Sequence, residues 1–246
     1  MKSMNLLAFA VCSTDATLRE QLPFPCGDID RESIPVMLRR RSSQAMQLAF
    51  SAAITACKQA EIAPINLPTL FASVAGEIQT TDQLCHELVK ADSVVSPSAF
   101  HNSVQNTVAG YWSIAHQSTQ AATALAAGQN TCAMALQEAW CQLAVQGGDL
   151  LVVCYDERWP DYLAPGLGQS AAAIALLLTV DDSQQGLARL GRPQRLPARA
   201  DFSEPLSFCA QPILEIAPLL GIVAAAMPST SVSVALGSEW AVSLTI

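Results

Sequence analysis

Residues 121–140 read AATALAAGQNTCAMALQEAW, a run of small apolar residues that is interrupted at Gly128 and Gln129. Its small apolar residues predict a strand up to Ala127, followed by a tight turn at Gly128 and Gln129 and a helix from about Asn130. Such a turn projects its corner residue above the unpaired N–H groups of the helix N-terminus, which stabilise an anion there. The position suits a nucleophilic serine or cysteine, but the amide of Gln129 cannot be a nucleophile at neutral pH.

The composition indicates a chain with a large core and few surface charges. Of its 246 residues, 51% are hydrophobic and 14% are charged. So few charges suggest that a partner covers part of the surface, although a compact alanine-rich core explains the same values equally well. The net charge of −8 argues against nucleic acid or an anionic membrane as a partner.

Cysteine usage and hydropathy bear on the compartment. The eight cysteines are scattered, without a CxxC pair or a histidine at zinc spacing, so we expect reduced thiols in a cytoplasmic protein, with no metal and no cofactor. The apolar run at residues 6–11 is too short for a signal peptide and predicts a first buried strand. No later run is long enough to span a bilayer.

Four pieces of sequence carry a family resemblance. They are VSPSAFHNSVQNTVAG (residues 95–110), AGYWSIAH (109–116), the strand–turn–helix, and GGDLLVVCYDE (147–157). Together they resemble the first half of a β-ketoacyl synthase of the thiolase superfamily, with Gln129 in place of the catalytic cysteine. Glutamine in that place is the mark of chain-length factors, the non-catalytic partners of type II polyketide ketosynthases. The short chain and the segment SPSAFHNSVQNTVAGYWSIA are most similar to the chain-length factor of aryl polyene synthesis.

The resemblance implies an α/β fold of the thiolase type, with five layers (αβαβα) and a shortened second half. Residues 1–246 then form one ketosynthase-like domain. Residues 1–160 are its N-terminal half, with the degenerate elbow, and residues 161–246 its truncated C-terminal half. Residue patterns alone predict helices at about 44–59, 80–90, 106–115, 130–146 and 212–227, strands at 70–75, 150–154 and 171–180, and a hairpin of 231–235 with 240–246. Ser42 and Ser43 can cap the first of these helices, and Ser96–Pro97 marks a loop before Ala99 and Phe100. The helix at 130–146 is expected to bury Met134, Leu136, Trp140 and Leu143.

The resemblance also implies which residues line the acyl tunnel and the dimer interface with a ketosynthase. They lie on the helix at residues 80–90 and just before it, in the segment 98–100, and on the strand before the turn. The resemblance implies that this strand pairs antiparallel with its counterpart across a two-fold axis. The implied residues are Ile78, Thr81, Leu84, Cys85, Leu88, Ser98, Ala99, Phe100, Ala121, Ala122, Thr123 and Ala124. Ordinary core packing explains the pattern of the helix at residues 80–90 equally well.

The other groups that a ketosynthase needs are missing from their expected places. In the family, two histidines downstream of the cysteine hold and decarboxylate the malonyl group, and a lysine supports them. Here His86, His101 and His116 all precede the turn, and neither histidine nor lysine follows it. Cys132 as a shifted nucleophile would lack a general base. Asp156 and Glu157 are adjacent on a predicted strand, so we expect them to point to opposite faces and not to act as a pair.

The implied function is a non-catalytic chain-length factor that pairs with an active ketosynthase, helps to form the acyl tunnel and limits product length. Acyl carrier protein should dock mainly on the partner, because this chain is acidic; Arg39, Arg40 and Arg41 are a local exception. The alternatives are a truncated ketosynthase, a malonyl-thioester decarboxylase that uses Gln129, and a purely structural scaffold for the partner.

Overall fold

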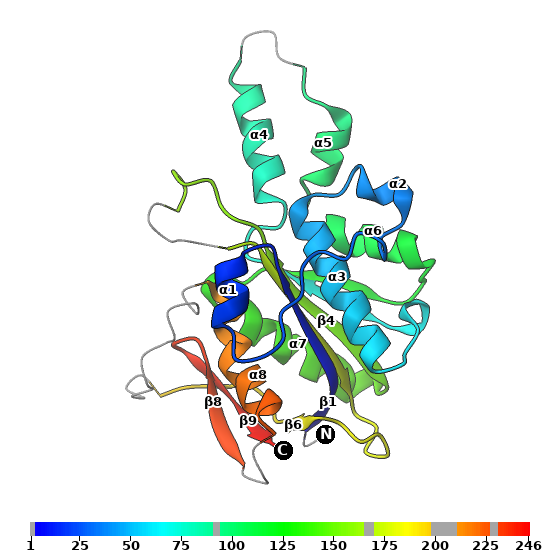
Figure 1. The fold of residues 1–246 in the computed structure, drawn as a ribbon, viewed down its shortest axis with the longest axis vertical. Helices are drawn as coiled ribbons and strands as arrows, with labels where there is room; N and C mark the ends of the chain where they lie inside the picture. The colour runs from blue at the N-terminus through cyan, green and yellow to red at the C-terminus, as the bar shows by residue number, and fades with distance from the viewer. Residues whose placement is uncertain (1–2, 91–93, 165–169, 198–210, 227–230) are drawn as a thin grey trace.

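The fold is built on one mixed sheet with helices on both faces, as seen in the computed structural model, which describes residues 3–90, 94–164, 170–197, 211–226 and 231–246 (Figure 1). The nine strands follow the order β3-β2-β4-β5-β1-β6-β9-β7, and β8 pairs with β9. Their bounds are β1 Met4–Ser13, β2 Thr69–Ala72, β3 Ala122–Leu125, β4 Asp149–Asp156, β5 Ala172–Thr179, β6 Ala188–Leu190, β7 Gln194–Arg195, β8 Val232–Leu236 and β9 Trp240–Thr245. The helices and 3-10 turns are α1 Ala16–Gln21, α2 Val36–Arg39, α3 Gln44–Gln59, η1 Pro64–Asn66, α4 Ile78–Leu88, α5 Pro97–Asn102, α6 Thr107–His116, η2 Gly128–Asn130, α7 Thr131–Gln146, η4 Pro212–Ile216 and α8 Ala217–Ala224.

The central strands β4 and β5 are the most deeply buried elements. Every residue of β5 is buried, as is every residue of β4 after Asp149. Their runs LLVVCY and AAIALLL are continuously apolar, which is expected for strands that are covered on both faces. β5 is antiparallel to both β4 and β1, whereas β2 runs parallel to β4 and β3.

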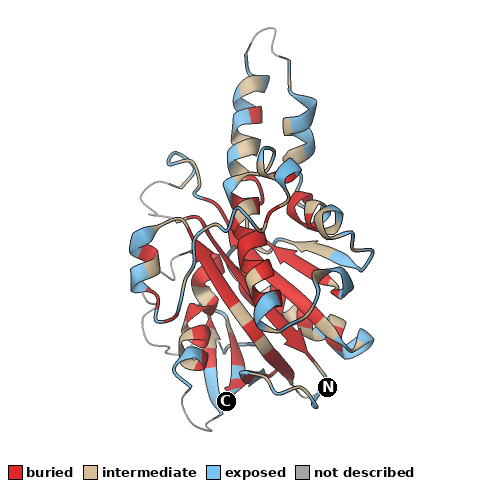
Figure 2. Ribbon diagram, turned by 45° about the vertical axis from the view of Figure 1, so that its right-hand side comes forward, coloured by how far each residue is buried: buried red, intermediate tan, exposed pale blue. Residues whose placement is uncertain are grey.

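One face of the sheet is covered by α3 and α6. Ser43 caps α3 as predicted, with its Oγ accepting a hydrogen bond from the N–H of Met46 at 3.0 Å. Trp112 of α6 is fully buried and lies edge-on to Phe50 of α3, with the ring centroids 5.2 Å apart. This aromatic contact joins the two helices on this face of the sheet. Figure 2 shows the central strands of the sheet mostly in red, as buried.

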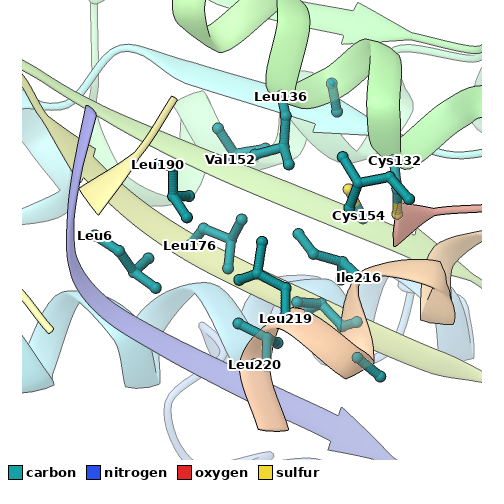
Figure 3. Packing of buried hydrophobic residues seen from close by; sticks show 14 of the residues in the cluster. Leu6, Cys132, Leu136, Val152, Cys154, Leu176, Leu190, Ile216, Leu219 and Leu220 are labelled. Carbon is teal, nitrogen blue, oxygen red and sulfur yellow. The ribbon is translucent and has the colours of Figure 1, made fainter. Parts of the chain in front are cut away.

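The other face is covered by α7, η4 and α8. Leu136 of α7 and Ile216 and Leu219 from the C-terminal helices pack with strand residues in one core (Figure 3). Met134 and Trp140 were expected to be buried, but both are only partly buried and pack at the margin of this core. Trp140 is instead stacked beneath Arg192, whose guanidinium carbon lies 5.3 Å from the ring centroid.

The C-terminal part adds a hairpin that packs on η4 and α8. The predicted hairpin is confirmed: β8 and β9 pair around Gly237, which has a φ of 68°. The helix predicted over residues 212–227 begins as the 3-10 turn η4 and continues as α8; residue 227 is outside the described residues. The far side of the hairpin carries exposed Ser233, Ser243 and Thr245. The hairpin belongs to the same mixed sheet, because β9 also pairs with β6 and β7.

The helices α4 and α5 project from the sheet as an arm (Figure 1, top). We call α4 and α5 together the arm. Leu84 is the residue of α4 that is buried. The segment around Ser98 was expected to follow a loop, but it is helical, because Ser96 Oγ caps α5 and Pro97 occupies its first turn. No helix in the described part of the chain combines the length and apolar character needed to cross a membrane.

Candidate functional site

The turn between β3 and α7 has the predicted shape. Gly128 has a φ of 56°, a conformation that residues with a Cβ rarely adopt, and Gln129 is exposed at the corner. Thr131 holds the turn from within, because its Oγ1 donates to the carbonyl of Gly128 at 2.7 Å and accepts from the N–H of Ala127 at 3.2 Å. Gln129 is therefore displayed at the corner by the turn and does not support it.

Cys132, the nearest thiol after the turn, points into the core. It is 0% exposed, and its Sγ donates to the carbonyl of Ile213 at 3.2 Å (Figure 3). The hydrogen bond with Cys154 and the burial of the thiol raise the pKa of Cys132 well above its usual value. Cys132 is thus a buried thiol whose surroundings favour the neutral form.

The three histidines lie on the arm and on α6. His86 is exposed on α4 beside Asp82, with 3.6 Å between Nε2 and the carboxylate oxygen, and His101 is exposed on α5. His116 packs against Trp112 with 4.1 Å between the ring centroids, and burial lowers its pKa. His86 and His101 are thus surface residues, and His116 packs against an aromatic ring.

The strand β3 forms an edge of the sheet. It pairs in parallel with β2, and in the described residues no strand pairs with its other edge. Ala121 and Ala122 are exposed, and Thr123 and Ala124 are partly buried. Such an edge presents free backbone N–H and C=O groups to another strand. The predicted antiparallel pairing across a two-fold axis remains a prediction.

The helix α4 has two distinct faces. Its polar face lines a cleft of about 660 Å³ with Gln79, Thr80, Asp82, Gln83 and His86. The opposite face carries the residues that the resemblance selected, namely Ile78, Thr81, Leu84, Cys85 and Leu88.

The exposure of these side chains bears on whether α4 is an ordinary core helix or one that faces a tunnel or an interface. Leu84 is buried, and Ile78 and Thr81 are partly buried, whereas Cys85 is exposed and Leu88 is 66% exposed. On α5, Ala99 is partly buried, Ser98 is exposed and Phe100 is 65% exposed. Because large apolar side chains remain uncovered on both helices, ordinary core packing does not explain the arm.

Three buried carboxylates at the base of the arm were not predicted. Glu77, Asp156 and Glu157 are only 2%, 2% and 3% exposed. Asp156 accepts hydrogen bonds from Ser73 and from the N–H of Val74 in the loop after β2, whereas Glu157 accepts one from α4. Asp156 and Glu157 take different hydrogen-bond partners, but Glu157 lies just beyond the end of β4, so strand alternation is not the reason. The expectation from the sequence also missed that both are buried and that Glu77 lies near Glu157.

Comparison with known families defines the class of protein. The family model described as "Beta-ketoacyl synthase, N-terminal domain" matches residues 14–205 of the 246. This chain belongs to the β-ketoacyl synthase family. No protein among the curated sequences matches it.

Solved structures of ketosynthases share the fold. A chain of the structure "Ketosynthase (ApeO) in Complex with its Chain Length Factor (ApeC) from Xenorhabdus doucetiae" matches with a TM-score of 0.71 and 16% identity, over 100% of both chains. A β-ketoacyl synthase from Burkholderia phymatum STM815 gives 0.60 and 13%, over 90% of this chain and 70% of that one. "The ishigamide ketosynthase/chain length factor" gives 0.58 and 16%, over 76% and 65%. These likenesses confirm the predicted thiolase-like ketosynthase fold, in a shortened form.

Proposed function

We propose that this chain is a non-catalytic chain-length factor that pairs with an active β-ketoacyl synthase. The observation that carries the proposal is Gln129, exposed at the corner where the family resemblance places the catalytic cysteine. A ketosynthase forms an acyl thioester on that cysteine, and an amide cannot form one. The next cysteine in the sequence, Cys132 on α7, is buried in the core, where its Sγ donates to the carbonyl of Ile213 in η4.

The general bases of a ketosynthase are also without counterparts. The three histidines precede the turn in sequence; His86 contacts the ring of Tyr162, and His101 and His116 contact aromatic rings of α6. No histidine or lysine follows Gln129 in the sequence. A chain with this residue set lacks the groups that would decarboxylate a malonyl thioester and drive condensation.

The proposed partner is a catalytic ketosynthase, which would bind along the arm and the open edge of β3. Leu88, Val89, Val94 and Phe100 are large apolar residues that are exposed on or beside the arm. Exposed apolar groups clustered in this way mark a protein interface. Two of the solved structures that share this fold are described as ketosynthases with their chain-length factors, which supports the same pairing here.

Within that pair, the face of α4 opposite the polar cleft and the segment 98–100 would line the path of the growing acyl chain. The product would be a type II polyketide of the aryl polyene kind, and tunnel length would limit the number of malonyl-derived units. We further propose that residues 1–246 act as a single cytoplasmic domain, with residues 1–160 and 161–246 as its two halves and with no cofactor.

The proposal is tested by restoring the missing nucleophile. In a complex whose partner has lost its own catalytic cysteine, Gln129→Cys should not restore condensation, because the histidines remain absent. Gln129→Ala, in a complex with an intact partner, should leave turnover within about twofold, since the corner amide supports no other residue. Product formation by the Gln129→Cys complex would contradict the proposal, and its measurement is mass spectrometry of carrier-bound acyl chains.

Carrier protein docking gives a second test. Arg39 is committed to the fold, because its guanidinium donates to the carbonyls of Ile34 and Glu32 at 2.7 and 3.0 Å, whereas Arg40 and Arg41 are exposed. Replacing Arg40 and Arg41 together by glutamate should change turnover by less than about twofold, because the carrier docks on the partner. A large, salt-dependent loss of turnover in an intact complex would show that this chain recruits the carrier.

A further inference from the structure

The base of the arm rests on buried carboxylates for which the proposed function has no use. Glu77 directly precedes α4, Asp156 ends β4, and Glu157 follows it. Within the described part of the chain, none of the three forms an ion pair with a lysine or arginine. Ionising a buried carboxylate that has no cation beside it costs free energy, so the charge state of these three groups affects the stability of the fold around them.

Glu77 connects the start of α4 to the start of α3. Ser43 Oγ donates to Glu77 Oε1 at 2.8 Å while it accepts the N–H of Met46 as the cap of α3. The carbonyl of Glu77 accepts the N–H of Thr81, the first hydrogen bond of α4. The Ser43–Glu77 hydrogen bond therefore fixes the position of α4 relative to α3.

Glu157 caps α4 from a distant part of the chain. Glu77 is the N-cap residue of α4, but its side chain accepts no hydrogen bond from the first turn. The N–H of Gln79 instead donates to Glu157 Oε1 at 2.8 Å. A carboxylate at a helix N-terminus is favourable because it meets unpaired N–H groups and the positive end of the helix dipole. This contact ties the first turn of α4 to the end of β4.

The segment after Glu157 braces the polar face of α4. Gln79 Nε2 donates to the carbonyl of Arg158, and the hydroxyl of Tyr162 donates to Asp82. The cleft of about 660 Å³ lies between this segment, α4 and the start of α3, and Glu157 and Ser43 form part of its lining. The cleft gives solvent protons a route to Glu157.

The groups around the carboxylates do not neutralise them. β4 contributes Tyr155 and Asp156, α4 contributes Asp82 and His86 to the cleft, and α3 contributes the uncharged Ser43 and Gln44. Arg158 lines the cleft, but it is exposed and pairs with Asp161 at 2.8 Å. If Glu77 and Glu157 both ionise, their repulsion must be relieved by water entry or by movement of α4.

We propose that Glu77 and Glu157 are positioning residues that hold the arm on the body of the protein, and that ionisation of both loosens it. Because the proposed function places the arm against the partner, loosening it would alter the tunnel wall, and that consequence alone rests on the proposed function. The attachment of the arm to the body depends on the hydrogen bonds of Glu77 with Ser43 and of Glu157 with Gln79.

The direction of the pH effect follows from burial. Burial raises the pKa of Glu77 to about 7, assisted by the charge of Glu157 and opposed by the Ser43 hydrogen bond. Burial also raises the pKa of Glu157, against the hydrogen bond from Gln79. For an acid whose pKa is higher in the folded state, stability is fully present below the unfolded pKa and is lost as pH rises through the folded value. The arm should therefore be held firmly in mild acid and loosen as pH rises through about 7.

The test is amide hydrogen exchange of the full chain at pH 6 and pH 8, corrected for intrinsic exchange rates. Protection of peptides from α4 and α5 should fall by about tenfold or more at the higher pH, while β4 and β5 stay protected. Glu77→Gln should keep most of the protection at pH 8, because glutamine still accepts the Ser43 hydrogen bond but carries no charge. The matched control is Glu20→Gln on α1, which is exposed, and it should behave like the wild-type chain.

Two results would overturn the inference: arm protection that does not change with pH, or the same pH dependence in wild type and Glu77→Gln. Adding the partner separates this inference from the proposed function. If the arm responds to pH but the partner does not protect it, the proposed interface fails and the positioning role stands. If the partner protects the arm but its amide exchange does not depend on pH, the positioning role fails and the proposed function stands.

Discussion

Phe100→Asp should break the proposed complex between this chain and a ketosynthase. Phe100 is 65% exposed on α5, so an aspartate there costs the isolated chain little stability. In the complex, the same aspartate would place an unpaired charge in an apolar interface. Loss of an interface anchor weakens binding by about 30-fold or more, and the measurement is the dissociation constant by calorimetry or interferometry.

The control for this variant is Leu187→Asp. Leu187 is 46% exposed and directly precedes β6, a strand that lies away from the arm (Figure 1). It should bind the partner as the wild-type chain does, with an unchanged melting temperature. Equal affinities for Phe100→Asp and Leu187→Asp would show that the arm is not part of the interface.

Thr81→Trp and Ala99→Trp should each shorten the product. Both residues are partly buried on the arm, Thr81 on the face of α4 opposite the polar cleft. A bulky ring on a tunnel wall cannot be absorbed by the surrounding structure, because packed protein yields little to added volume. Elongation should stop earlier while the first condensations continue, and the measurement is the distribution of product lengths by mass spectrometry in a reconstituted pathway.

Gln83→Trp is the matched control for these two variants. It adds the same ring to the same helix, but on the exposed face that lines the cleft. This variant should leave the length distribution unchanged. If all three tryptophan variants form intact complexes and give wild-type lengths, the chain does not set length through the arm, and a purely structural scaffold becomes the better explanation.

Local patterns predicted much of the fold, because the strong signals are short-range. Ser43 before an apolar helical repeat marked the start of α3, and the continuous apolar runs marked β4 and β5. Gly128 marked the turn, because its left-handed conformation favours glycine. The Ser–Pro pair at residues 96–97 was interpreted as a loop, although the same pair is also a helix-start signal, and α5 begins there.

The buried carboxylates could not be predicted in this way. A glutamate or aspartate in sequence normally indicates surface, since such residues are almost never fully buried. Glu77 and Glu157 are separated by 80 positions in the chain, and their closeness depends on β2 and β4 lying side by side in the sheet. Residue periodicity carries no information about that pairing. Likewise, the meaning of Gln129 came from the family resemblance, while its exposure came from the structure.

The central claim is that this chain contributes to polyketide synthesis only as the non-catalytic half of a pair. The most direct measurement is condensation of malonyl-carrier substrates by this chain alone, by the partner alone and by the two together, with product lengths resolved by mass spectrometry. The account predicts full-length product only from the pair, and no condensation or malonyl decarboxylation by this chain alone. Condensation or decarboxylation by the isolated chain, or the same product from the partner alone, would contradict it.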